Sequence, residues 1–138
     1  MRKQELDSWL KDGGKLPENL TEDEESYLEE NGWNCIKSYY ENGFLIREQH
    51  YLNGKFHGEH RWFCEEGSDR VTVRRYKHGE RHGVWEFYDS LSVKKELKGY
   101  HMGKKHGVWI NVNGYGVRSF HKEYAYGILL KDHLKEEF

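Results

Sequence analysis

A repeated eight-residue motif constrains the fold of this chain more than any other feature. It occurs at residues 51–58, 76–83 and 100–107, and each copy reads Y-x-x-G-[KE]-x-H-G. The final glycines of successive copies lie 25 and 24 residues apart. A fixed period of this length is the signature of a repeat architecture, in which each unit packs mainly against its neighbours. We align a fourth, degenerate copy at residues 120–127, where Glu123 replaces the first glycine and Tyr126 replaces the histidine.

Each period also contains two short blocks of β-branched and aromatic residues, which favour strands. One block follows the motif, and its copies are residues 37–40, 60–63, 85–88 and 109–112. The other leads into the next motif, and its copies are residues 44–51, 70–76, 92–97 and 117–120. Turn sequences separate the two blocks, at residues 41–43, 65–67, 89–91 and 113–114.

Glycines inside the motif predict tight turns, because glycine accepts the positive φ that short hairpins require. The repeat glycines are Gly54, Gly58, Gly79, Gly83, Gly103 and Gly107. Each period is then two strands and two turns, and stacked periods form an antiparallel meander. We therefore predict a mainly β fold in which residues 33–127 form a single layer of repeated β-hairpins, with aromatic side chains on both faces.

The segments on either side of the repeats differ from them. Residues 1–32 form an acidic head with two expected short helices, one over residues 4–11 and one over residues 20–32, where Thr21 and Glu24 make a capping box. Residues 128–138 carry spaced leucines and predict a short amphipathic helix that caps the end of the sheet. The acidic residues of the second head helix are Glu22, Asp23, Glu24, Glu25, Glu29 and Glu30.

Charge is unevenly distributed along the chain. The net charge is −2, but residues 1–33 hold 4 basic and 10 acidic residues, whereas residues 34–138 hold 18 basic and 14 acidic residues. The head could therefore bind a basic partner surface, imitate nucleic acid or fold against the basic strands of its own body. Deleting residues 1–30 distinguishes a structural cap from a binding element.

No residue pattern predicts catalysis. His57, His82 and His106 recur at the repeat period, about 10 Å apart, which is too far for one metal ion. We expect each ring to pack beside a turn with its N–H bonded to a carbonyl. Cys35 and Cys64 lack a metal-binding spacing, and no nucleophile or phosphate-binding motif is present. The sequence predicts a non-enzymatic protein with no metal and no cofactor.

Aromatic and arginine residues give the best indication of function, since Trp, Tyr and Arg dominate protein–protein hot spots. The candidate partner-binding residues are Tyr40, Trp62, Arg74, Arg75, Trp85, Tyr88 and Trp109. Basic residues also gather in successive repeats, which favours an alternative: binding of an anionic ligand such as RNA or a phospholipid headgroup. Otherwise these residues form a solvated strand face, paired with Glu86 and Glu96.

The three motif copies, together with the GVWEFY and GVWI segments that follow two of them, resemble the MORN repeat in its bacterial variant form. The resemblance covers residues 33–127. It implies a sheet of consecutive β-hairpins without catalytic residues, and the bacterial variant is often labelled an antitoxin. Residues 8–21 resemble the opening of some small phage and prophage proteins.

Together these observations predict a protein-binding repeat module that neutralises or scaffolds one partner protein. The resemblance suggests a toxin or a host defence factor as that partner. The opening residues 1–14 are charged and lack an apolar segment, which predicts a cytoplasmic protein. We expect a monomer, with an edge-paired dimer as the alternative.

Overall fold

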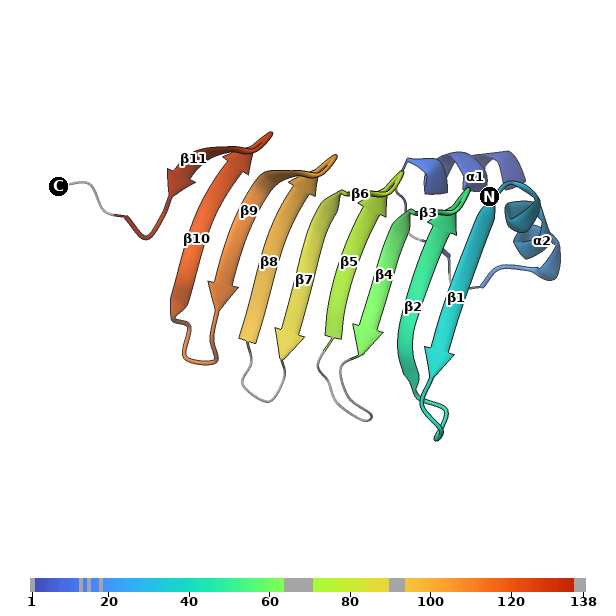
Figure 1. The fold of residues 1–138 in the computed structure, drawn as a ribbon, viewed down its shortest axis with the longest axis horizontal. Helices are drawn as coiled ribbons and strands as arrows, with labels where there is room; N and C mark the ends of the chain where they lie inside the picture. The colour runs from blue at the N-terminus through green and yellow to red at the C-terminus, as the bar shows by residue number, and fades with distance from the viewer. Residues whose placement is uncertain are drawn as a thin grey trace.

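The computed structural model describes residues 2–12, 14, 16–17, 19–63, 71–89 and 94–135. These residues form two short helices followed by eleven strands (Figure 1). The elements are α1 (Lys3–Lys11), α2 (Glu22–Glu30), β1 (Trp33–Tyr39), β2 (Leu45–Leu52), β3 (Lys55–Phe56), β4 (Gly58–Phe63), β5 (Val71–Lys77), β6 (Glu80–Arg81), β7 (Gly83–Asp89), β8 (Lys94–His101), β9 (Lys104–Val112), β10 (Arg118–Ala125) and β11 (Ile128–Asp132).

All the strands belong to one antiparallel sheet with the order β1-β2-β4-β5-β7-β8-β9-β10-β11. The two-residue strands β3 and β6 pair with β2 and β5 beside the tight turns. Each strand therefore neighbours the next one along the chain, and the sheet remains an open single layer (Figure 1). This arrangement confirms the predicted meander of β-hairpins. The expected turns at residues 65–67 and 89–91 fall wholly or mostly outside the described residues.

The motif turns form because two consecutive residues adopt positive φ, as a tight hairpin turn requires. In the first motif these residues are Asn53 and Gly54, with φ of 51° and 79°. His78–Gly79 and Met102–Gly103 repeat the same geometry. The fourth turn is Tyr126–Gly127, with φ of 48° and 89°. Gly127 is thus equivalent to the first glycine of each motif, and the alignment of a fourth copy at residues 120–127 was wrong by four residues.

The motif histidines join one period to the next at the turn edge of the sheet. Nδ1 of His57 accepts a hydrogen bond of 3.0 Å from the backbone N–H of His78, the next positive-φ residue. His82 and His106 accept equivalent bonds of 3.1 Å from the turn residues Met102 and Tyr126. The expected packing beside a turn is correct. At Nδ1 all three rings accept from a backbone N–H, and the expected bond from a ring N–H to a carbonyl is present for His57, whose Nε2 donates to the Leu10 oxygen.

The two head helices were predicted correctly, and they lie at the β1 end of the sheet (Figure 1). Glu24 N–H donates to the Thr21 hydroxyl and Thr21 N–H donates to the Glu24 carboxylate, at 3.1 and 3.0 Å, which forms the capping box. The helices bury apolar side chains against the first hairpin. This cluster comprises Leu6, Leu10, Leu28, Trp33 and Leu52.

Two polar contacts fix α1 against the sheet. Trp33 Nε1–H donates to Asp7 at 2.9 Å, and His57 Nε2 lies 2.7 Å from the backbone oxygen of Leu10. His57 is completely buried, so its second hydrogen bond also satisfies a polar atom that water cannot reach. The head is therefore an integral cap on the first repeat.

The C-terminal segment contradicts the expected amphipathic helix. Residues 128–132 form β11, which pairs antiparallel with β10 and continues the meander. Ile128, Leu129 and Leu130 are 48–67% exposed, so no apolar face is buried there. The Tyr126–Gly127 hairpin turn places this segment beside β10, and cross-strand pairing then decides its conformation. Of the two described helices, neither has the length and apolar composition needed to cross a bilayer.

Candidate functional site

Strand alternation gives the sheet two chemically different faces. On one of them, here called the aromatic face, rings from successive strands contact one another with centroids 4.7–5.6 Å apart. Tilted and edge-on contacts at these distances stabilise aromatic pairs beyond simple burial. The ring ladder consists of Tyr51, Phe56, His60, Tyr76, Trp85, Tyr100, Trp109 and Tyr124.

One ring in each period is anchored to the preceding strand. Trp85 Nε1–H donates to the Arg75 carbonyl at 2.8 Å, and Trp109 Nε1–H donates to the Gly99 carbonyl at 2.8 Å. His60 occupies the same place in the first repeat, with Nε2 2.9 Å from the His50 carbonyl. Each ring forms a hydrogen bond with the backbone carbonyl ten residues earlier, which fixes the position of the ring relative to the strands.

Basic side chains lie over these rings. The Arg74 guanidinium is 5.7 Å from the Trp62 ring centre and 5.4 Å from that of Trp85. Arg47 lies 5.8 Å from Trp62 on its other side. The Lys105 ammonium is 4.7 Å from the Trp109 ring centre and 5.2 Å from that of Tyr124. Cation–π attraction therefore holds these charges against the sheet.

Three of these cations, Arg47, Arg74 and Lys105, form no ion pair with any residue in the described part of the chain. Lys98, which also lies over Trp109, pairs with Glu96 at 3.1 Å. Trp62 remains 42% exposed between its two arginines. Among the described residues, the aromatic face thus presents fixed positive charge without an acidic partner above a row of rings.

On the opposite face, one network of side chains neutralises its charges internally. Arg75 donates to Glu86 at 2.6 Å and to Glu59 at 3.2 Å, and the Tyr88 hydroxyl donates to Glu86 at 2.6 Å. Burial opposes ionisation of Glu86, but the hydrogen bonds from Tyr88 and Arg75 outweigh it and lower its pKa. This network therefore holds its ionic side chains to one another.

The candidate partner-binding residues consequently separate into three groups. Trp62, Arg74, Trp85 and Trp109 gather on the aromatic face. Arg75 and Tyr88 lie in the opposite network, where Arg75 makes the pair with Glu86 that the sequence offered as its alternative. Tyr40 lies at the turn between β1 and β2, where its backbone N–H donates to Phe44.

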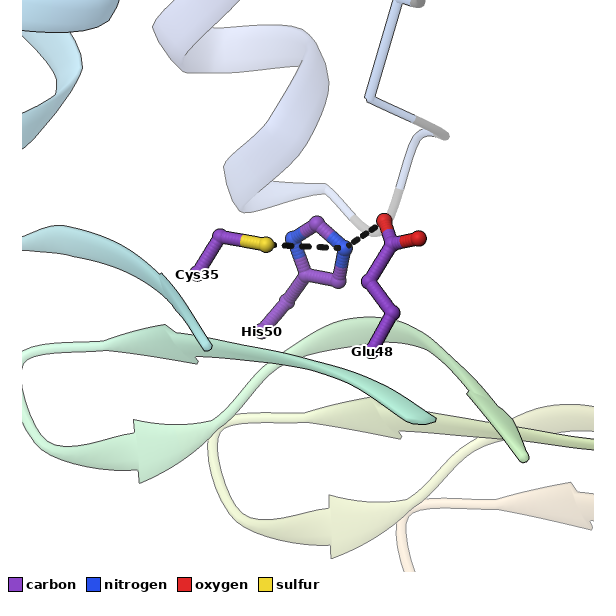
Figure 2. A group of neighbouring side chains, drawn as sticks. All are labelled: Cys35, Glu48 and His50. Carbon is purple, nitrogen blue, oxygen red and sulfur yellow. Dashed lines mark hydrogen bonds and ion pairs between the residues drawn. The ribbon is translucent and has the colours of Figure 1, made fainter. Parts of the chain in front are cut away.

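A second polar cluster lies on the opposite face, beside the head. Cys35 on β1 is the cross-strand partner of His50 on β2, and Glu48 is two residues before His50 on the same face (Figure 2). His50 Nε2 lies 2.7 Å from a Glu48 oxygen and 3.8 Å from Cys35 Sγ. Arg61 donates to the other Glu48 oxygen at 2.7 Å. Burial opposes ionisation of Glu48, but the bonds with His50 and Arg61 prevail and lower its pKa.

This cluster borders a cavity of about 310 Å³ between the head and the sheet. Glu48 and His50 are both 8% exposed, and both line it. The other charged residues of the lining are Glu25, Lys37, Glu59 and Arg61. The sequence prediction missed this cluster, because its members come from two strands and meet only through the β1–β2 register. The one local signal for it was the spacing of Glu48 and His50, which places both side chains on the same face of a strand.

The cluster does not have the geometry of an activated cysteine nucleophile. Such a site needs the thiol and the orienting carboxylate on different nitrogens of the histidine, whereas Sγ and the carboxylate both contact Nε2 here. Partial desolvation, followed by the charge of Glu48, also raises the pKa of the Cys35 thiol. A neutral thiol is a poor nucleophile.

The acidic head makes its described ion pairs within itself, between Asp23 and Lys3 at 2.6 Å and between Asp7 and Lys11 at 2.8 Å. Glu24 is used in the helix cap. The described residues show no ion pair between α2 and the basic strands of the body. The sequence left three roles open for the head. These contacts do not support the role in which its acidic side chains pair with the basic strands of the body.

Comparison of the chain with models of known protein families gives no match, and comparison with curated proteins finds no significant relative.

Proposed function

We propose that this chain is a non-enzymatic binding module that neutralises or scaffolds a partner protein through its aromatic face. The observation that carries the proposal is the set of Arg47, Arg74 and Lys105, three cations held on rings without a carboxylate partner in the described part of the chain. A partner that supplies carboxylates at this spacing would complete charge pairs with cations that have no acidic partner among the described residues. We therefore assign the partner an acidic surface.

The size of the face suits a protein interface. The ladder crosses seven strands, from β2 to β10, which at about 4.8 Å per strand is a width of about 29 Å. With strands about 20 Å long, the flat area is on the order of 600 Å². A typical stable interface buries roughly 800 Å² on each partner, and side-chain relief adds to the flat area.

Ring packing argues against the alternative in which single-stranded RNA stacks on the face. Base stacking requires an open ring surface. Tyr100 and Trp109 are only 8% and 9% exposed, and their rings contact neighbouring rings and lysine or arginine side chains. The chain as a whole is also slightly acidic, with a net charge of −2, whereas nucleic-acid-binding domains are usually basic.

The setting proposed for this activity is the cytoplasm, with an antitoxin-like or counter-defence role towards one protein. The polar cluster supports a non-enzymatic role. The Cys35 thiol and the Glu48 carboxylate both contact Nε2 of His50, so the three groups cannot act as nucleophile, orienting acid and base. The sheet elsewhere forms an open layer without a second layer to enclose a substrate (Figure 1).

Affinity capture from an extract of the source organism tests the proposal. The tagged protein is incubated at low and high salt, and the retained proteins and nucleic acids are both quantified. We expect one protein to be retained at both salt concentrations, because ion pairs buried in a protein interface are screened much less than exposed charges. Capture of RNA or lipid alone, lost as salt rises, would instead support the anionic-ligand alternative.

A further inference from the structure

The side chains of Cys35, Glu48 and His50 bring three different metal-ligating atoms to one place (Figure 2). The sulfur, the imidazole nitrogen and the carboxylate oxygen all lie within 4.8 Å of one another. The convergence follows from the fold: Cys35 and His50 are directly paired across β1 and β2, and Glu48 points to the same side two residues earlier.

We propose that Cys35, Glu48 and His50 form a Zn²⁺ site with three protein ligands. In tetrahedral zinc sites the metal lies about 2.3 Å from sulfur and about 2.0 Å from nitrogen or oxygen, which separates the ligand atoms by about 3.3–3.5 Å. The observed separations are 3.8 Å between Sγ and Nε2 and 2.7 Å between Nε2 and the Glu48 oxygen. Small side-chain shifts bring both to the required values.

The donor set selects the metal. A thiolate with an imidazole and one carboxylate suits Zn²⁺, whereas Mg²⁺ and Ca²⁺ prefer oxygen ligands alone. The ion takes the place of the proton that His50 Nε2 now shares with Glu48, and the Cys35 thiol loses its own proton on binding. Three protein ligands leave one position for water.

Neighbouring residues prepare the site. Arg61 holds the second Glu48 oxygen at 2.7 Å, which orients the carboxylate and leaves the other oxygen towards His50. The 310 Å³ cavity bordered by Glu48 and His50 gives an entry path for the ion and its water. Cys35 is exposed at the surface, so its thiol can move to meet an ion. Zinc here would join β1 to β2 beneath the head.

Titration with Co²⁺ and then Zn²⁺ tests the site, because a thiolate bound to tetrahedral Co²⁺ gives characteristic absorption that Zn²⁺ abolishes. We expect one ion per chain in the wild-type protein. Cys35→Ser should remove the thiolate–cobalt band and weaken zinc binding at least about tenfold. The matched control is Cys64→Ser, which changes the other cysteine of the chain and should leave both signals unchanged.

His50→Asn provides the second ligand test, with circular dichroism to establish that it folds. Zinc should raise the melting temperature of the wild-type protein by several degrees and that of Cys35→Ser by much less. Binding that survives Cys35→Ser unchanged, or that disappears with Cys64→Ser, would overturn the assignment. So would dependence on His133, which pairs with Glu123 at the other end of the sheet. The zinc site does not depend on the proposed partner.

Discussion

Acid should destabilise this protein through one buried histidine. His60 lies between the rings of Phe56 and Tyr76, with centroids 4.7 and 4.8 Å away. Desolvation lowers its pKa from 6.5 to about 4; the hydrogen bond with the His50 backbone and the charge of Glu48 favour protonation, and the charges of the His50 ring and Arg74 oppose it. The folded protein therefore keeps His60 neutral through a pH range in which the unfolded chain takes up a proton.

The size of the effect follows from the two pKa values. Because the folded-state pKa lies below the unfolded value, the stabilisation is fully present above pH 6.5 and is lost as the pH falls towards 4. At 1.36 kcal/mol per pH unit, the loss is about 3 kcal/mol. His57 and His82, whose pKa values desolvation also lowers, add to it in the same direction.

The later repeats provide a variant that removes this dependence. There the place of His60 is taken by Trp85 or Trp109, and the place of Phe56 is taken by a basic residue such as Lys105. The double substitution F56K/H60W gives the first repeat the same pair, with an indole N–H that does not titrate. Its unfolding free energy should fall by about 3 kcal/mol less than that of the wild type between about pH 7.5 and pH 4.

Urea unfolding followed by circular dichroism at several pH values measures the difference. F56K alone retains His60 and is the control that should remain acid-sensitive. Parallel stability curves for the wild type and the double variant would refute the reasoning, because they would show that His60 is not held neutral by its surroundings.

Two further predictions concern packing. Gly99→Ala should lower the free energy of unfolding by about 3 kcal/mol, because the new Cβ would meet the backbone carbonyl of His106 at the β8–β9 irregularity. Gly107 has a positive φ but open space around it, so Gly107→Ala should lower it by only about 1–2 kcal/mol in the same urea assay. Leu10→Ala should cost about 3 kcal/mol, since Leu10 is 2% exposed in the head core, whereas Leu129→Ala on the exposed β11 should cost less than about 1 kcal/mol in thermal melts. Equal losses within either pair would contradict the packing described.

Local signals in the sequence were sufficient for the repeat fold. The motif glycines adopt positive φ at Gly54, Gly79 and Gly103, and the strand blocks around them pair as predicted. The capping box of Thr21 and Glu24 is also a local signal, and it correctly predicted where α2 begins. These features depend on residues close together in the sequence, where backbone preference and side-chain chemistry act directly.

Features that depend on pairing between strands were not predictable in this way. β11 has leucines at helical spacing, but the Tyr126–Gly127 turn and pairing with β10 make it a strand. The sequence also did not determine which arginine would lack an ion pair among the described residues, since Arg74 and Arg75 are adjacent and differ only in the face they occupy. The Cys35–His50 contact depends on the exact β1–β2 register. That register shifts between Ser38 and Tyr39, next to the turn that joins the two strands.

The proposed role of the aromatic face is tested by comparing two variants that lose the same charge from opposite faces. R74A/K105A removes two ring-bound cations from the aromatic face, and K37A/K95A removes two exposed lysines from the other. Each is tested by quantitative capture of the partner that the wild type retains. We expect at least about a tenfold loss of captured protein with R74A/K105A and little change with K37A/K95A. Unchanged capture by R74A/K105A, or loss with K37A/K95A alone, would contradict the proposed role.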